Sequence, residues 1–205
     1  MYLVCADLEG IFVPEIWINV AKHTGIEELR LTTRDINDYD ALMKRRLEIL
    51  HRNRLTLHVI QHVISGIRPL PGATELISWL RKRAQLIIVS DTFTEFADPL
   101  MEKLGRPVLF CNNLTVDHLG YITDYNLRLA DGKMKAAEAF QSLNYKVIGI
   151  GDSYNDINML RRSDIGILYR PPQNVINDNP DIQVVNSYDE LKQVISGYMD
   201  KEKSR

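Results

Sequence analysis

Short apolar runs and amphipathic stretches alternate along most of this chain. The apolar runs are rich in Val, Ile and Leu, and they cover residues 2–6, 85–89, 107–111, 146–150, 164–168 and 182–185. Such runs are typical of strands buried on both faces, as in parallel sheets covered by helices. Helical periodicity appears between them, at residues 72–83, 94–104, 133–143, 155–162 and 188–198. The pattern predicts an α/β fold with a Rossmann-like parallel sheet.

Two segments interrupt this alternation. Residues 14–67 contain no strand-like run, and they predict a helix over 15–24 and a long amphipathic helix over 39–64. We therefore expect a small helical cap (14–70), inserted after the first strand of a core formed by residues 1–13 and 71–205. The second segment, 114–129, has β-branched and aromatic residues around Asp-His-Leu-Gly, and this predicts a β-hairpin.

Two further expectations concern the continuity of helices. Pro99 lies inside the helix expected over 94–104 and should bend or interrupt it, because proline lacks the amide hydrogen that the helix needs. The C-terminal sequence MDKEKSR, residues 199–205, is charged and poor in apolar residues. We therefore expect it to be frayed.

Composition limits the classes of partner. The 205-residue chain carries 25 Lys and Arg against 27 Asp and Glu, a net charge of −2, so neither nucleic acid nor an anionic membrane is expected as a partner. No apolar stretch approaches the roughly 20 residues of a membrane span. Cys5 and Cys111 lie in apolar runs, which is typical of buried free thiols. With no leader-like segment before the first strand, we expect a cytoplasmic protein. The sequence leaves its oligomeric state open, a homodimer among the alternatives.

Three of the expected strands end in polar sequences. Asp-Leu-Glu-Gly (7–10) follows the first strand, Ser-Asp-Thr (90–92) follows the strand at 85–89, and Gly-Asp-Ser-Tyr-Asn-Asp (151–156) follows the strand at 146–150. In open α/β sheets, ligands bind at the carboxyl ends of the strands, where loops meet helix N-termini. These three segments are therefore expected to meet in one site.

The acidic residues of these segments indicate a divalent cation. Brought together, the strand-end acids would repel one another unless a cation lay between them; they are Asp7, Glu9, Asp152 and Asp156. Mg²⁺ prefers oxygen ligands and is usually held by one or two carboxylates, so it fits such a cluster. Lys133 starts an expected helix, where its charge opposes the helix dipole. This placement indicates a bound anion that the lysine neutralises.

In order and spacing, these segments resemble the four motifs of the haloacid dehalogenase-like phosphatases. The insertion after the first motif resembles the small cap of the phosphoserine phosphatases. The runs DLEGIFVPEIWI, TTRDINDYDALMK, SDTFTEF, GDSYNDINML and GILYRPPQNVI are similar to those of the bifunctional phosphoserine phosphatase and phosphoserine:homoserine phosphotransferase branch, the ThrH type. The resemblance covers nearly the whole chain. It implies Mg²⁺ as the cofactor, with phosphoserine and homoserine as substrates in serine and threonine metabolism.

The resemblance also implies how the phosphoryl group is handled. Asp7 would be the nucleophile that forms an aspartyl-phosphate, and Glu9 would be the general acid and base. Magnesium would be held by Asp7, Asp152 and the backbone carbonyl of Glu9, while Asp156 would orient these ligands. Lys133 would neutralise charge in the transition state. The residues expected to bind the phosphoryl oxygens or the donor are Ser90, Lys133 and Asn155.

The same resemblance assigns recognition of the amino acid to the cap. Glu15 would bind the ammonium group of phosphoserine. Arg46 would bind its carboxylate, for which a planar guanidinium is suited. Arg34 is a weaker candidate for that role. Trp17 and Tyr39 are candidates for the wall of the pocket.

Two places depart from the usual pattern of the family. Asp91 and Thr92 stand where phosphoserine phosphatases usually have two glycines, and they are expected to add contacts to an amino-acid substrate. Glu9 stands where the superfamily usually has an aspartate. Its extra methylene should shift the water or alcohol slightly without removing the acid–base role.

Two other interpretations stay open. A related phosphatase would act on another small phosphate ester, although Glu15 and Arg46 argue against a neutral one. A receiver-like signalling module also phosphorylates a strand-end aspartate, but the long helical insertion and the late loop at 151–156 argue against it. For the enzyme, the sequence leaves open whether water or homoserine is the acceptor.

Overall fold

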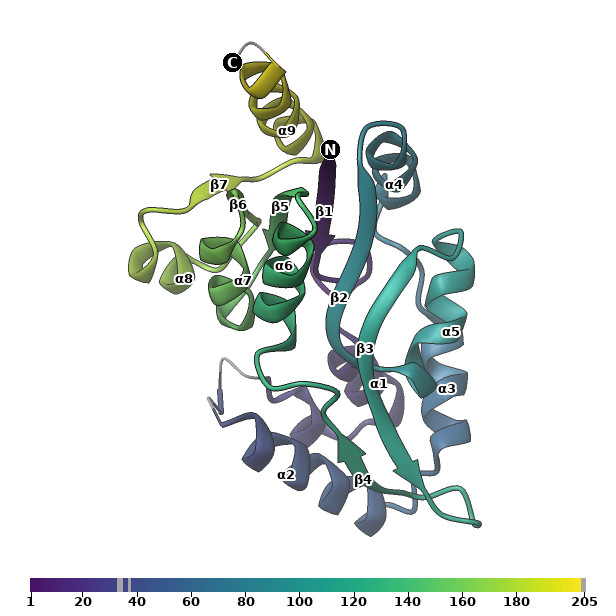
Figure 1. The fold of residues 1–205 in the computed structure, drawn as a ribbon. Helices are drawn as coiled ribbons and strands as arrows, with labels where there is room; N and C mark the ends of the chain where they lie inside the picture. The colour runs from purple at the N-terminus through teal and green to yellow at the C-terminus, as the bar shows by residue number, and fades with distance from the viewer. Residues whose placement is uncertain (33–34, 37, 204–205) are drawn as a thin grey trace.

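The centre of the structure is a seven-stranded sheet (Figure 1). The computed structural model describes residues 1–203 apart from 33, 34 and 37. The strands lie in the order β4-β3-β2-β1-β5-β6-β7, and neighbours are parallel except β3 and β4, which are antiparallel. The strands are β1 (Tyr2–Ala6), β2 (Gln85–Phe93), β3 (Val108–Val116), β4 (Ile122–Asn126), β5 (Lys146–Gly151), β6 (Ile165–Tyr169) and β7 (Gln183–Val185). The predicted fold class is confirmed.

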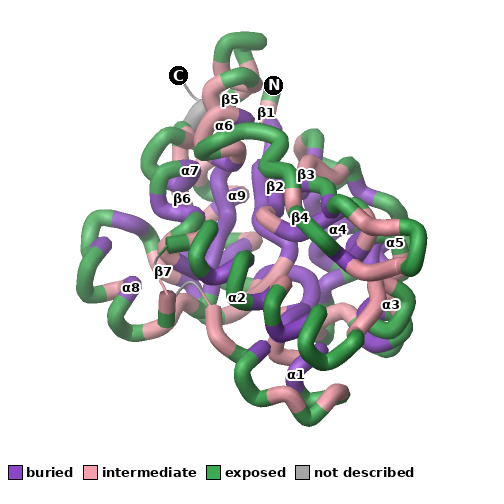
Figure 2. Tube along the Cα trace, turned by 90° about the horizontal axis from the view of Figure 1, so that it is seen from below, coloured by how far each residue is buried: buried purple, intermediate pink, exposed green. Residues whose placement is uncertain are grey.

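Both faces of the sheet are buried by helices. Along β1, Val4 and Ala6 join an apolar cluster with α4, α5 and α9, whereas Leu3 and Cys5 join a second cluster with α6, α7 and α8. Figure 2 accordingly shows the central strands as buried and the outer faces of the helices as exposed. Cys5 and Cys111 are free thiols, as predicted, although Cys111 is only half-buried. The helices are α4 (Ala73–Arg81), α5 (Thr94–Lys103), α6 (Gly132–Ser142), α7 (Ile157–Arg162), α8 (Gln173–Asp178) and α9 (Tyr188–Lys203).

Among the described residues between β1 and α4, the chain forms four helical segments, and we call them the cap helices. They are α1 (Ile16–Thr24), the 3-10 helix η1 (Glu27–Arg30), α2 (Tyr39–Arg52) and α3 (Leu57–Gly66). The single helix expected over 39–64 is wrong, because the chain breaks between α2 and α3. Arg54 there has the left-handed φ of 52°, which ends a helix. Figure 1 places the cap helices beyond the carboxyl end of β1.

The predicted hairpin is formed by β3 and β4, and it reaches the cap helices. The Leu57 amide at the start of α3 donates to the Gly120 carbonyl at the hairpin tip (2.8 Å). The Tyr125 hydroxyl of β4 donates to the Asp40 carboxylate of α2 (2.5 Å). These bonds explain why the helix breaks before Leu57, because its amide bonds to the hairpin instead of to the preceding turn.

Helix α5 continues through Pro99, so the expected interruption is wrong. A proline at this position cannot bond to the carbonyl four residues earlier, which belongs to Glu95. That carbonyl instead accepts a hydrogen bond from the Gln61 side chain of α3 (2.8 Å). A cap residue therefore satisfies the group that Pro99 leaves open.

Replacing Gln61 with alanine should destabilise the chain by about 1 kcal/mol, because the partly buried Glu95 carbonyl would lose its partner. Urea unfolding followed by circular dichroism measures the difference. Gln173→Ala, on an exposed turn of α8, is the matched control and should have little effect. Equal stabilities of the two variants would contradict the role given to Gln61.

The C-terminal part of the chain is more helical than predicted. Helix α8 was not expected, because its six residues are too short to show a period. Helix α9 runs to Lys203, and Met199 is buried in the core, so the expectation of a frayed end from residue 199 is wrong over the described part. No described helix, α9 included, combines the length and apolar character needed to cross a bilayer.

Candidate active site

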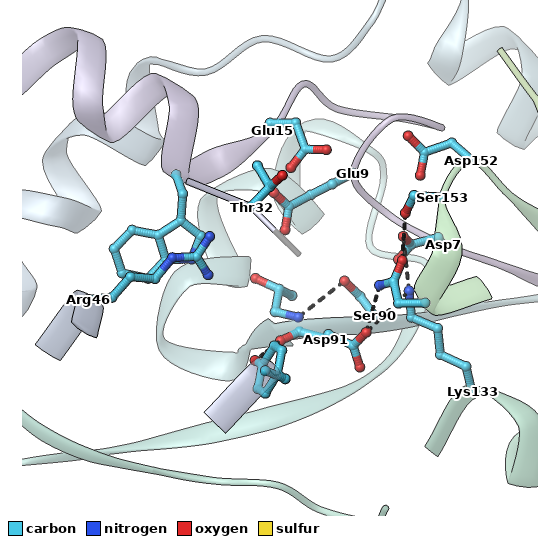
Figure 3. Close-up of a pocket in the computed structure, with 14 residues that line it drawn as sticks. Asp7, Glu9, Glu15, Thr32, Arg46, Ser90, Asp91, Lys133, Asp152 and Ser153 are labelled. Carbon is cyan, nitrogen blue, oxygen red and sulfur yellow. Dashed lines mark hydrogen bonds and ion pairs between the residues drawn. The ribbon is translucent and has the colours of Figure 1, made fainter. Parts of the chain in front are cut away.

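A pocket of about 80 Å³ lies between the ends of β1, β2 and β5 and the cap helices (Figure 3). Figure 3 shows Asp7, Asp152 and Lys133 on one side of it and Arg46 on the other. Of the predicted site residues that the structure describes, only Asp156 does not line the pocket; it is fully buried. The predicted residues that do are Asp7, Glu9, Glu15, Arg46, Ser90, Asp91, Thr92, Lys133, Asp152 and Asn155.

Lys133, near the start of α6, binds several carboxylates at once. Its Nζ lies 2.8 Å from Asp156 Oδ1, 3.0 Å from Asp7 Oδ2 and 3.5 Å from Asp91 Oδ2. Burial alone would lower the pKa of Lys133, but these carboxylates more than offset it and hold the pKa well above its ordinary value. The lysine is therefore a permanent positive charge beside Asp7.

Three buried carboxylates lie close enough to share a cation. Oxygens of Asp7, Asp152 and Asp156 lie within 4.8 Å of one another. Lys133 offsets only one of the three charges, and burial raises the pKa of Asp7 well above its ordinary value in spite of that lysine. An oxygen-only set with excess negative charge fits Mg²⁺.

The loop after β5 holds its carboxylates tightly. Asp156 Oδ2 accepts the amides of Asp152 (2.9 Å) and Ser153 (3.1 Å). Two glycines make room for this packing: a Cβ on Gly10 would lie 2.3 Å from Asp152 Oδ2, and one on Gly151 would lie 2.3 Å from Asp156 Cβ. The glycines of the two motifs are therefore required by the close approach of these carboxylates.

Glu9 lines the pocket next to α1. Its Oε2 accepts the Ile16 amide at the start of α1 (2.7 Å), which fixes the direction of the carboxyl group. Burial, and secondarily the negative charge of Glu15, raise the pKa of Glu9 to about 8. A carboxyl group of this kind can hold a proton near neutral pH and give it up to a base.

The opposite end of the pocket contains a buried cation. The Arg46 guanidinium lies over the Trp17 ring at 4.5 Å from its centroid, and its Nη2 donates to the Leu31 carbonyl (2.9 Å). Its Nε is buried and has no hydrogen-bond partner among the described residues. Burial lowers the pKa of Arg46 to about 10. An anion bound beside the guanidinium would offset the cost of burying its positive charge.

The segment after Val89 forms a bulge in β2. Pairing with β3 shifts register between Val89 and Phe93, and the bulge places Ser90, Asp91 and Thr92 against the pocket. The Thr92 amide donates to Ser90 Oγ at 3.3 Å. Ser90 Oγ therefore accepts one hydrogen bond, and its own O–H can be donated to an anion in the pocket.

The comparisons with known proteins agree with this geometry. Residues 6–164 match the family described as haloacid dehalogenase-like hydrolases. The chain is a haloacid dehalogenase-like hydrolase. The hydrolase is 53% identical over 190 residues to a phosphoserine phosphatase of Pseudomonas syringae pv. tomato, covering 93% of this chain and 80% of that one. It is 50% identical over 192 residues to phosphoserine phosphatase ThrH of Pseudomonas aeruginosa, covering 94% of each. The resemblance predicted from the motifs is confirmed.

Solved structures share the fold of the hydrolase. A phospho-aspartyl intermediate analogue of a phosphoserine phosphatase superposes with a TM-score of 0.77 at 23% identity, covering 94% of this chain and 98% of that one. A substrate-bound phosphoserine phosphatase also gives 0.77 at 23% identity, covering 95% and 97%. Membership of a hydrolase family favours an enzyme over the receiver-like alternative.

The hydrolase also places residues at the site that the sequence did not single out. Thr32 and Ser153 line the pocket, as do the suspected wall residues Trp17 and Tyr39. Ser153 belongs to the loop motif, so its position gave a signal, whereas nothing in the spacing around Thr32 did. The weaker candidate, Arg34, lies outside the described residues.

Proposed function

We propose that this hydrolase is a magnesium-dependent phosphoserine phosphatase that also transfers the phosphoryl group to homoserine. The observation that carries the proposal is one pocket with two chemically different ends. Lys133 and Asp7 form an ion pair at one end, and buried Arg46 lies at the other. The relatives at 53% and 50% identity are named phosphoserine phosphatases, and the homoserine step rests on the resemblance of the motifs.

Asp7 is the proposed nucleophile. Its Oδ1 accepts the Leu8 amide (2.8 Å) and its Oδ2 faces Lys133, so the carboxylate is held in one orientation. Attack on phosphorus forms a bond to Asp7 and breaks the bond to the serine oxygen, which Glu9 protonates. Water or homoserine then attacks the same phosphorus, the bond to Asp7 breaks, and Glu9 takes the hydroxyl proton. Transfer to homoserine would serve threonine synthesis, and hydrolysis would yield serine.

The proposed holders of magnesium are Asp7, Asp152 and the backbone carbonyl of Glu9. A bound Mg²⁺ would neutralise negative charge on the phosphoryl group. Asp156 is assigned the role of orienting the loop, since its oxygens already bind Lys133 and the amides of the loop after β5. This division leaves the carboxylates of Asp7 and Asp152, which line the pocket, for the ion.

The proposed amino-acid subsite uses opposite charges. Glu15 would bind the ammonium group, and Arg46 the carboxylate, at the Nε that has no partner among the described residues. Ser90, Thr92 and Asn155 would hold the phosphoryl oxygens or the donor. We propose that residues 14–70 act as a cap that encloses the substrate and limits access of water.

Phosphorus NMR tests the function directly. The purified chain would be incubated with phosphoserine and magnesium, with and without homoserine. A phosphohomoserine signal that grows as phosphoserine disappears supports the transferase. Free phosphate alone, unchanged by homoserine, leaves a phosphatase only. Absence of both products would refute the proposal.

Arg46→Ala should raise the KM for phosphoserine about tenfold to a hundredfold, because a charge-assisted hydrogen bond to the carboxylate is lost. Phosphate release at varied substrate concentration measures it. Phosphoethanolamine lacks the carboxylate, so its KM should change much less. Arg45→Ala, an exposed neighbour on α2, is the matched control. Equal losses with both substrates would show that Arg46 acts only on the fold of the cap.

A further inference from the structure

A second, larger pocket adjoins the active site. It encloses about 670 Å³ between α2, the segment 127–134, the loop after β5 and α8. We call it the outer pocket and the active-site cavity the inner pocket. Four side chains line both of them and so form the wall between them; they are Tyr39, Asp91, Lys133 and Asn155.

Hydrogen bonds that a ligand could replace hold this wall closed. Asn155 Nδ2 donates to Asp91 Oδ2 (2.8 Å), and the Tyr39 hydroxyl donates to the Asp91 carbonyl (3.2 Å). The Asp91 side chain is 41% exposed, and Asn155 is exposed as well. Because water already competes for these groups, a polar ligand can replace the bond between Asp91 and Asn155 at little cost. The bond between Asp91 and Asn155 can therefore open while Lys133 keeps its buried ion pairs with Asp7 and Asp156.

The outer pocket has an excess of negative charge. Asp91, Asp131 and Asp178 line it. Lys133 is the only Lys or Arg lining it among the described residues, and that lysine already faces Asp7 and Asp156. This excess of negative charge attracts an ammonium group and repels a phosphate ester. The outer pocket is thus matched to an amine rather than to a phosphorylated donor.

Exposed apolar side chains complete the outer pocket. Leu127 is 48% exposed and Leu129 is 43% exposed, and both line this cavity together with Met134. Large apolar side chains gathered at a cavity favour a ligand with a hydrocarbon part. A short methylene chain carrying an ammonium group fits both the charge and the apolar wall.

We propose that the outer pocket binds a small amine-bearing alcohol, the phosphoryl acceptor, and passes it to the inner pocket when the Asp91–Asn155 hydrogen bond opens. The inference rests on the proposed phosphotransferase function and adds a binding site for its second substrate. In the inner pocket, the acceptor oxygen bonds to phosphorus, the bond between phosphorus and Asp7 breaks, and the hydroxyl proton moves to Glu9. No other reactant is needed.

Removing charge from the outer pocket tests the inference. The double variant Asp131→Asn/Asp178→Asn keeps side-chain shape, and asparagine tolerates the left-handed φ of 52° at position 131. With magnesium and phosphoserine, the KM for 3-aminopropan-1-ol as acceptor should rise about threefold to tenfold. Hydrolysis of phosphoserine without alcohol should stay unchanged. Asp98→Asn/Asp189→Asn, which removes two exposed acids on α5 and α9, is the charge-matched control.

Two comparisons sharpen the test. Butan-1-ol has similar length but no charge, so it should be a poorer acceptor and insensitive to the double variant. Asn158→Trp should obstruct the outer pocket and raise the KM for 3-aminopropan-1-ol, whereas Asn158→Ala should not. Equal effects on acceptor and phosphoserine, or an acceptor KM that no variant changes, would overturn the inference. So would a wild-type chain that hydrolyses phosphoserine but transfers to no alcohol, an outcome that leaves the phosphatase intact.

A binding measurement keeps the site testable without turnover. Ligand-observed NMR on the intact chain with magnesium would follow 3-aminopropan-1-ol alone. Weaker binding to Asp131→Asn/Asp178→Asn than to the wild type supports the outer pocket even if phosphoserine is not a substrate. Equal binding to both, or none to the wild type, overturns it.

Discussion

Asp7→Asn is expected to lower the kcat for phosphoserine by about 10⁴-fold or more, because an amide cannot form the phosphoryl–enzyme bond. The variant keeps the size of the side chain and an oxygen for the Leu8 amide, so the fold should persist. Phosphorus NMR would show neither phosphate nor phosphohomoserine. Incubation of the wild type followed by rapid denaturation should trap phosphate on the chain, and the variant should trap none.

A control variant separates the loss of the nucleophile from the mere loss of one negative charge. Asp189→Asn also removes one negative charge, but on the exposed face of α9, and should keep full activity. If Asp7→Asn retained more than a few per cent of the wild-type rate, water would have to attack the substrate directly. That result would remove the aspartyl-phosphate from the mechanism and with it the route to homoserine.

Lys133→Met should be the second most damaging change. Its Nζ is the buried counter-charge to Asp7 and Asp156, so its loss should lower kcat about 10²-fold to 10³-fold. Without added metal, the free energy of unfolding should also fall by about 3–5 kcal/mol, because removal of one partner leaves buried carboxylates unpaired. Phosphate release and urea unfolding measure the two effects.

Lys135 provides the comparison for this prediction. It lies two residues further along α6 and has no ion pair shorter than 4.0 Å to a described carboxylate. Lys135→Met should therefore change neither rate nor stability appreciably. A Lys133→Met variant as stable as Lys135→Met would mean that the carboxylates are already neutralised by protons.

The residues at the strand ends could be predicted from the sequence, because each apolar run and the polar residues after it are adjacent along the chain. A buried parallel strand requires an apolar run, and the polar residues that follow it must lie at one edge of the sheet. For the same reason the sequence predicts that Asp7, Ser90 and Asp152 share one site. The ion pairs of Lys133 with Asp7 and Asp156 could not be predicted in this way, because the spacing of residues along the chain does not give distances between side chains.

The errors arose where distant segments override local preference. Pro99 stops an isolated helix, but here Gln61 from the cap satisfies the carbonyl that Pro99 leaves open. The helix expected over 39–64 breaks because Leu57 bonds to the hairpin at Gly120. The outer pocket cannot be predicted from the sequence because its lining comes from five separate segments, and the motif residues among them, Asp91, Lys133 and Asn155, also line the active site.

The hairpin of β3 and β4 has a mechanical consequence for the enzyme. Strand β4 is the edge of the sheet and has only β3 as a neighbour, yet its tyrosine and its turn hold α2 and the start of α3. An outward swing of α2 must therefore move this edge strand or break the hydrogen bond between Tyr125 and Asp40. The hairpin thus limits how far α2 can move away from the pocket. Shortening the 117–121 turn should therefore change the rate at which substrate enters and leaves, although no catalytic residue lies in that turn.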